Sequence, residues 1–182
     1  MRTATTLAAC AFAVGLAACQ QKIAAPPPPQ SLTPEAMAHF CGMNVLEHPG
    51  PKGQILLSSH PDPVWFVSAR DTLAFTMLPD EPKDIRAIYV SDMAKATDWS
   101  KPGADNWVDA HKAWFVIGSD ARGGMGAQET VPFSDERAAK EFIGRHGGKA
   151  VRFADVPKSA VLTQTGEAPS SGAAPANIPG GR

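Results

Sequence analysis

The chain has 182 residues, a formal net charge of −1 and charged side chains at 19% of its positions. Since Lys and Arg are not in excess, the charge gives no reason to expect nucleic-acid binding. Beyond the N-terminal apolar stretch, no segment approaches the roughly 20 apolar residues that a membrane-spanning helix needs. Membrane attachment is therefore expected through lipid alone, and the length suits one compact domain.

The first residues have the features of a bacterial lipoprotein signal. Arg2 precedes an apolar run over residues 7–18, and small residues lead up to Cys19. We therefore expect residues 1–18 to be a signal peptide and Cys19 to become a lipidated N-terminus in the cell envelope, facing the periplasm. The next residue is Gln20, not the Asp that retains lipoproteins at the inner membrane, which favours the outer membrane.

Two segments rich in Pro, Gly and small residues flank the expected body. Residues 19–30, with four consecutive prolines, are expected to form an extended linker between the lipid and the body. Residues 164–182 could bury little apolar surface and are expected to be a disordered tail. The sequence thus predicts one domain over residues 31–163.

The domain is expected to begin with a short helix. Thr33, Pro34 and Glu35 suit a helix N-terminus, because Pro fits the first helical position and an acidic residue fits the first turn. Gly42 is a natural terminator, so the helix should end near Phe40. Cys41 would then lie at a junction between helix and loop.

A strand–strand–helix–strand pattern follows twice, over about 54–93 and 112–156. The expected strands are apolar runs at 54–57, 63–67, 85–90, 112–117, 130–133 and 149–153. Ser68 and Ser134 are expected to cap the two helices, and Gly147 with Gly148 to end the second. The sequence therefore predicts an α+β fold of duplicated units in one compact body, preceded by the short N-terminal helix.

Cys41 is the residue that most directly indicates a function. With Cys10 removed in the signal peptide and Cys19 lipidated, Cys41 would be the only free thiol of an exported protein. A lone thiol in an oxidising compartment is liable to oxidation, so its presence calls for a role. His39 and Met43 lie two residues away on either side, and thiolate, thioether and imidazole together suit Cu(I).

Met125 is a further candidate ligand, because glycines on both sides leave its side chain uncovered. The alternatives are structural: Met125 could pack inward at a hairpin tip, and Cys41 and Met43 could fill the core. His48 is a second candidate imidazole beside His39. The pattern favours copper binding through Cys41, Met43, His39 and Met125.

Several other chemistries lack their motifs. The sequence has no Cys-x-x-Cys pair, and its glycine-rich segment at 123–126 lacks the Lys-Ser/Thr of a phosphate loop. We therefore predict a copper chaperone and not an enzyme. Two alternatives stay open: a thiol-dependent envelope enzyme with Cys41 as nucleophile, and a metal-free scaffold lipoprotein.

Several segments also share one order along the chain with a known family. They are residues 39–43 (HFCGM), 47–54, 88–93, 107–110, 114–119 and 124–126, and together they resemble the NosL family of nitrous oxide reductase accessory lipoproteins. The resemblance implies Cu(I) binding for the copper–sulfide centre of nitrous oxide reductase, its client, beside an ABC-type transporter complex in the inner membrane. It also implies a duplicated α+β fold similar to that of the organomercurial lyase, with Cys41 and Met43 as ligands and His39 and Met125 as further candidates.

Overall fold

The structure, a computed structural model, describes residues 25–162. The signal peptide, the lipidation site Cys19 and the expected tail at 164–182 lie outside the described residues. Among the described residues, no helix has both the length and the apolar character to cross a membrane.

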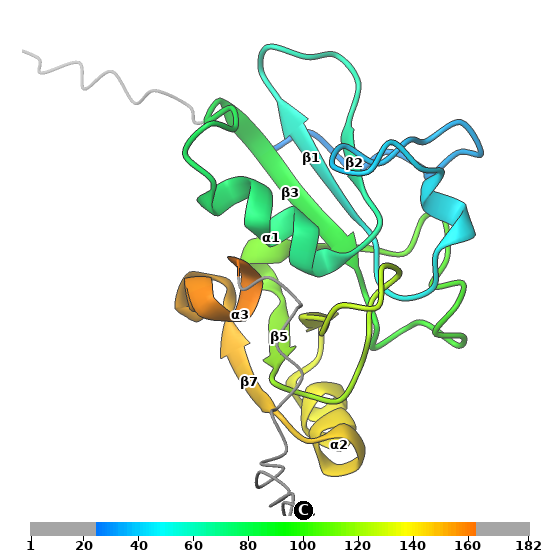
Figure 1. The fold of residues 1–182 in the computed structure, drawn as a ribbon, viewed down its shortest axis with the longest axis vertical. Coiled ribbons are helices and arrows are strands. Elements are labelled where there is room, and N and C mark those ends of the chain that lie inside the picture. Colours follow the sequence, from blue (N-terminus) through cyan, green and yellow to red (C-terminus); the bar gives the residue numbers. More distant parts are fainter. Residues whose placement is uncertain (1–24, 163–182) are drawn as a thin grey trace, which may run out of the picture.

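The first unit is an antiparallel sheet with one helix packed on it (Figure 1). Its strands are β1 (Gly53–Leu57), β2 (Val64–Phe66), β3 (Ile85–Ser91) and β4 (Trp107–Asp109), in the order β2-β1-β3-β4. The helix α1 (Ala69–Met77) connects β2 to β3. Two 3-10 helices, η1 (Val45–Glu47) and η2 (Ala110–Lys112), precede β1 and follow β4.

The second unit repeats this connectivity. Its strands are β5 (Trp114–Ile117), β6 (Val131–Phe133) and β7 (Lys149–Arg152), in the order β6-β5-β7, and α2 (Glu136–His146) connects β6 to β7. In both units the first strand is central, the second and third pair with it antiparallel on opposite sides, and the helix precedes the third. The predicted α+β duplication is confirmed. The 3-10 helix η3 (Phe153–Asp155) and the helix α3 (Lys158–Leu162) follow.

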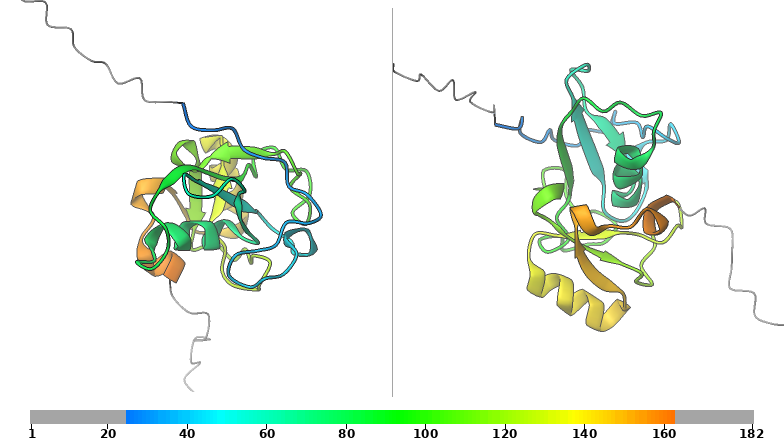
Figure 2. Two further views of the ribbon diagram at one scale, coloured as in Figure 1. Left: turned by 90° about the horizontal axis from the view of Figure 1, so that it is seen from above. Right: turned by 90° about the vertical axis from the view of Figure 1, so that its left-hand side faces the viewer.

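One hydrophobic cluster joins the two units. Alternate residues of β1 and β3, such as Ile55 and Ile88, point with Leu73 of α1 into the same cluster as Phe115 of β5. Neighbouring β5 residues point the other way, and Val116 packs in the cluster beneath α2. The second sheet thus lies between α2 and the shared core, as the side view in Figure 2 shows.

The helix ends show which capping predictions hold. Ser68 caps α1 as predicted, its side chain accepting from the N–H of Asp71 at 2.9 Å. The N-cap of α2 is Asp135, which accepts from the N–H of Arg137 at 2.7 Å, and not Ser134 as predicted. The N–H of Ser134 donates instead to Asp92 at 2.9 Å, which keeps Ser134 one residue ahead of the helix.

The predicted helix before the first unit does not form. From residue 36 to 39, buried and exposed positions alternate, which is the period of an extended chain. The N–H of His39 donates to the carbonyl of Trp65 in β2 at 2.9 Å instead of to a carbonyl four residues earlier. Ala38 and His39 therefore lie beside the edge strand β2, and the first helical turn of the described chain is η1.

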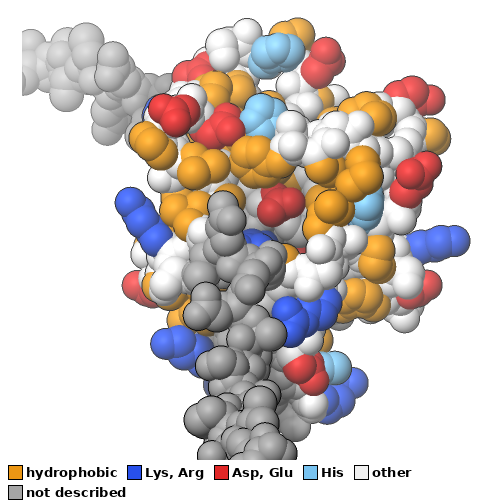
Figure 3. Space-filling model, viewed as in Figure 1, with side chains coloured by type: hydrophobic (Ala, Val, Ile, Leu, Met, Phe, Trp, Pro, Cys, Tyr) orange, Lys and Arg blue, Asp and Glu red, His pale blue; other side chains and the backbone are white. Residues whose placement is uncertain are grey.

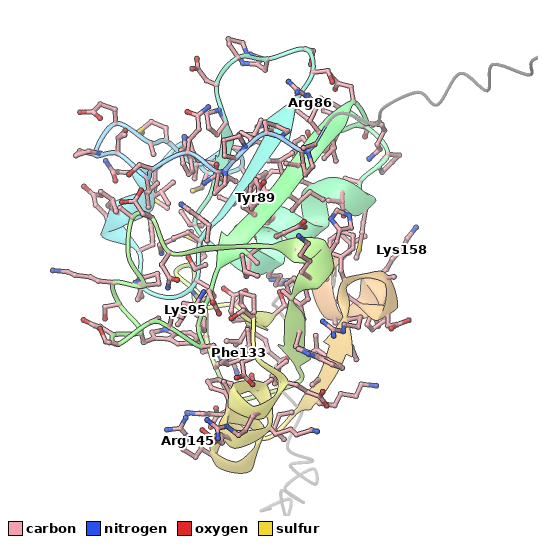
Figure 4. All side chains as sticks on the ribbon, turned by 180° about the vertical axis from the view of Figure 1, so that it is seen from behind. Arg86, Tyr89, Lys95, Phe133, Arg145 and Lys158 are labelled. Carbon is pink, nitrogen blue, oxygen red and sulfur yellow. The ribbon has the colours of Figure 1, made fainter. Side chains whose placement is uncertain are left out.

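Part of the proline-rich segment lies on the first sheet. The hydroxyl of Tyr89, labelled in Figure 4, donates to the carbonyl of Pro27 at 2.7 Å. Gln30 and Gln54 exchange two hydrogen bonds, each 2.8 Å long. Gln54 is fully buried by this pairing, so the folded body begins a few residues before the expected boundary at 31.

We predict that Asp135→Ala destabilises the protein by about 1 kcal/mol, because it removes the N-cap acceptor of α2. Glu141→Ala, which removes only an exposed ion pair with Arg137 on α2 and leaves the cap intact, should cost less than half of that. Urea unfolding of both variants measures the difference, and equal or reversed effects would contradict the assignment of the cap.

Candidate metal centre

Residues 36–45 form a narrow hairpin that presents Cys41 at its tip. Met37 and Asn44 form an antiparallel bridge, and the N–H of Ala38 donates to the carbonyl of Met43 at 2.8 Å. Gly42 closes the turn with a φ of 65°, a conformation that a residue with a side chain rarely adopts. Because Ala38 also bridges to Trp65 of β2, the hairpin is fixed to the first sheet next to its turn.

The two sulfur atoms predicted as primary ligands both come from this hairpin. Cys41 is exposed and carries a free thiol. Met43 is half-buried where the hairpin returns toward η1. One residue, Gly42, separates them. Cys41 is open to solvent, and Met43 is partly covered by the rest of the protein.

His39 is held on the same hairpin by an acidic partner. Its Nε2 lies 3.1 Å from both carboxylate oxygens of Glu81, and its ring packs edge-on against Phe66 and Phe75. While this pair is intact, only Nδ1 remains as a metal-binding nitrogen. A carboxylate on the second ring nitrogen is a common way to orient a metal-binding histidine.

Met125 comes from a loop of the second unit, and 53% of its surface is exposed. The loop is closed by hydrogen bonds of 2.9 Å from Gly123 N–H to Ala127 and from Gly126 N–H to Gly123. Its backbone lies against His48, since a Cβ at Gly124 would stand only 2.5 Å from the Cβ of His48. The structure thus brings the Met125 loop against the segment that follows Met43.

The hairpin, η1 and the Met125 loop carry the large apolar side chains that remain exposed in the described part of the chain. These are Met37, Phe40, Leu46 and Met125, which are 44–53% exposed. On the face shown in Figure 3, Lys and Arg lie mostly over the lower half of the molecule, and acidic and apolar side chains mostly over the upper half. Exposed apolar groups that gather in one region are typical of an interaction surface.

Beneath the loops lies a pair of buried ionisable residues that the sequence did not reveal. Lys52 is 2% exposed, and its ammonium donates to the backbone carbonyls of His48, Pro49 and Val67. Burial lowers the pKa of Lys52 to about 8. In a run of Pro, Gly and polar residues, Lys52 has no sequence signal that would distinguish it from a surface lysine.

Glu129 is the acidic member of this pair and is 1% exposed. Its Oε1 accepts from the N–H groups of Arg70 (2.8 Å) and Thr130 (2.9 Å), while Oε2 has no hydrogen-bond partner among the described residues. Burial raises the pKa of Glu129 to about 8, although these hydrogen bonds oppose the shift. A Cβ at Gly123 would clash with Oε2, so the Met125 loop rests directly on this carboxyl.

The donor set limits which metal the site could bind. Within residues 25–162 there is no group of three or more His, Cys, Asp or Glu side chains placed to hold an ion. A site at Cys41 with three or more protein ligands would therefore need a donor of another kind, such as methionine sulfur. Thioether ligands select Cu(I) over the harder ions such as Mg²⁺ and Ca²⁺.

These features define a small duplicated α+β protein that presents cysteine and methionine side chains on two adjoining loops. The NosL family model matches residues 29–161, and the chain belongs to the NosL family. It is 45% identical to the copper-binding lipoprotein NosL of Achromobacter cycloclastes over 90% of this chain and 86% of the relative. It is 34% identical to the copper-binding lipoprotein NosL of Stutzerimonas stutzeri over 86% of this chain and 81% of the relative.

A solved structure supports the same relationship. The crystal structure of the copper chaperone NosL from Shewanella denitrificans matches with a TM-score of 0.68 and 34% identity. The match covers 73% of this chain and 99% of that one. The α+β architecture is therefore shared with a family member of known structure.

We predict that Glu129→Gln removes part of the pH dependence of stability. The pKa of Glu129 is raised in the folded state, so its contribution to stability is full below about pH 4.5 and is lost as the pH rises through about 8. The loss cannot exceed about 1.4 kcal/mol per pH unit for one proton. Gln cannot ionise and should retain the bonds that Oε1 accepts.

Urea midpoints at pH 5 and pH 8 give the measurement. The midpoint of the wild-type protein should fall relative to that of Glu129→Gln as the pH rises. The exposed Glu141→Gln variant should follow the wild type. A parallel pH course for wild type and Glu129→Gln would show that the carboxyl is ionised throughout.

Proposed function

We propose that this protein is a copper chaperone that binds Cu(I) at Cys41 and Met43 and delivers it to a client protein. The supporting observation is the exposed thiol of Cys41 on a hairpin whose neighbouring segment contacts the Met125 loop. Met125 would supply a further thioether, and His39 is a nitrogen candidate through Nδ1. Relatives that are copper-binding lipoproteins and a copper chaperone support the same function.

The chemistry of the site suits storage and transfer of a monovalent ion. A thiolate anchors Cu(I), and neutral thioethers complete its coordination without adding charge. Because Cys41 is exposed, a ligand of the client can approach the copper before Cys41 releases it. The exposed apolar side chains of Met37, Phe40 and Leu46 would form the surface that contacts the client.

We further propose that the client is nitrous oxide reductase, with copper used for its copper–sulfide centre, and that the protein works beside an ABC-type transporter complex. These partners follow from the family resemblance. The lipoprotein relatives and the signal-like N-terminus support a lipid anchor at Cys19, facing the periplasm. Gln20 after the anchor favours the outer membrane.

An enzymatic role for Cys41 has less support. A nucleophilic cysteine needs a general base beside it. His39, two residues away, turns its Nε2 to Glu81, and His48 turns its Nδ1 to the carbonyl of Gly124. These two contacts orient the imidazoles of His39 and His48 toward groups other than the Cys41 thiol.

We predict that Cys41→Ser lowers Cu(I) affinity by more than about 100-fold, because loss of second-sphere partners alone typically costs 10–100-fold. Met43→Leu should weaken binding less, and Met77→Leu, in α1 against the shared core, should leave it unchanged. Competition with a Cu(I) chelator under reducing conditions measures the three affinities. Undiminished affinity in Cys41→Ser would refute the anchor role.

A second prediction concerns the position of the Met125 loop. In Gly124→Ala the new methyl group meets the Cβ of His48 and, at 3.2 Å, the carbonyl of Pro49, so the loop must move away. We expect Cu(I) affinity to fall about tenfold, on the scale of second-sphere effects, although no ligand is changed.

Gly144→Ala is the matched control, because a Cβ there meets nothing within 4 Å. The same chelator competition compares the two variants. If both bind copper as tightly as the wild type, Met125 has no part in the site.

A further inference from the structure

The two faces of the first sheet are covered by different parts of the chain. Along β1, Ile55 points toward α1, so its neighbours Gln54 and Leu56 point away from that helix. Tyr89 of β3 pairs with Gln54 across the ladder and shares this second face. Leu56 and Tyr89 are only 7% and 8% exposed. In Figure 1, α1 lies in front of the sheet, and the N-terminal segment, in blue, passes behind it.

Residues 27–32, which we call the strap, lie over this second face. The hydrogen bonds of Pro27 with β3 and of Gln30 with β1, described above, hold its start and its middle. At its end, the N–H of Leu32 donates to the carbonyl of Ala104 at 2.9 Å, and the Leu32 side chain is buried. The strap is therefore bound to the body along its whole length.

The residue at which the strap begins limits how far the body can stand from a lipid anchor. Cys19 and Pro27 are eight positions apart in the sequence. A fully extended chain spans about 3.5 Å per residue, so this tether reaches about 28 Å at most. If the strap were released as far as Leu32, the same calculation would allow about 45 Å. Docking of the strap therefore removes about a third of the possible reach.

The hairpin at 36–45 lies on the opposite side of the same sheet. It crosses the edge strand β2, to which its backbone bonds next to the turn. The ring of His39 then packs edge-on against Phe66 of β2 and Phe75 of α1. Cys41 follows two residues later on this α1 side. The first sheet therefore lies between the strap and the hairpin that carries the thiol.

We propose that the docked strap orients the lipid-anchored protein, with the strap face of the first sheet toward the membrane and Cys41 on the side away from it. This inference rests on the proposed function, since it requires the lipid anchor at Cys19. The short tether keeps the strap face near the lipid surface. The hairpin stays open on the other side, so a client protein would approach it from the periplasm and not along the bilayer.

Energy transfer to the membrane surface tests this orientation. The lipidated protein is added to vesicles of phosphatidylethanolamine and phosphatidylglycerol that carry an acceptor dye on a lipid headgroup. A donor dye is attached to Cys41, or to the new thiol of Ser58→Cys in a Cys41→Ser background. Ser58 is exposed and lines a cleft together with the prolines at 27–29, so it reports on the strap side.

A strap variant shows whether docking sets the orientation. Tyr89→Phe combined with Gln54→Leu removes the side-chain groups that bond to Pro27 and Gln30, and it nearly preserves the size of both side chains. Gln30→Ala is the matched control, because only backbone atoms of Gln30 take part in these bonds. Circular dichroism of each variant checks that the fold is retained.

We expect stronger energy transfer from position 58 than from Cys41, both in the protein with an unaltered strap and in Gln30→Ala. In the strap variant, transfer from position 58 should fall and the difference between the two positions should be lost. A strap variant that folds and keeps the difference would overturn the inference.

The comparison of the two dye positions with an unaltered strap is decisive even if the strap variant does not fold. Equal transfer from both positions, or stronger transfer from Cys41, would overturn the inference and leave the lipid anchor and copper binding standing. A protein that does not sediment with the vesicles would refute the lipid anchor together with the inference. Chelator competition measures copper binding independently of both.

Discussion

The two loops that carry the sulfur side chains meet where the backbone of Gly124 lies against His48. The approach is so close that even a methyl group at Gly124 would overlap the Cβ of His48. The hydrogen bond from His48 Nδ1 to the Gly124 carbonyl then fixes the loop of the second unit to the segment after Met43. The candidate metal centre therefore depends on the packing of the two units, because the segment that leads into the first unit and a loop of the second unit meet there.

The protein interior beneath this contact contains two ionisable side chains, which is unusual for a protein core. Lys52 and Glu129 are both buried, and each satisfies backbone groups of segments that converge under the loops. Burying ionisable groups costs free energy, and such groups often specify one arrangement of the surrounding chain. Here they link the start of α1, the approach to β1 and the approach to β6. Above this base, Cys41 and Met125 are exposed on the two loops.

The periodic parts of the fold could be predicted from the sequence because local patterns determine them. Both strand–strand–helix–strand units, the Ser68 cap and the Gly147 terminus follow from apolar runs and end signals. The helix predicted before Cys41 was wrong because the N–H of His39 donates to Trp65 in β2 and that of Ala38 donates to Met43 across the hairpin. Asp135 replaced Ser134 as the cap for a similar reason, since Asp92 binds the N–H of Ser134.

The candidate ligands could be named from the sequence, but their positions relative to one another could not be predicted from it. Cys41, Met43 and His39 are neighbours in the chain, so the hairpin at 36–45 groups them in any case. The approach of the Met125 loop to His48 depends on how the two units pack, and no spacing in the sequence encodes it. Lys52 and Glu129 were missed because charged residues are rarely buried, and nothing local marks these two as exceptions.

The central claim is that sulfur from this protein binds a monovalent copper ion. Copper K-edge X-ray absorption of the reduced, Cu(I)-loaded wild-type protein tests it most directly, because the scattering distinguishes sulfur from nitrogen and oxygen. The account predicts copper retained after removal of the excess, with more than one sulfur atom bound to it. Copper that washes out, or that is bound by nitrogen and oxygen alone, would contradict the account.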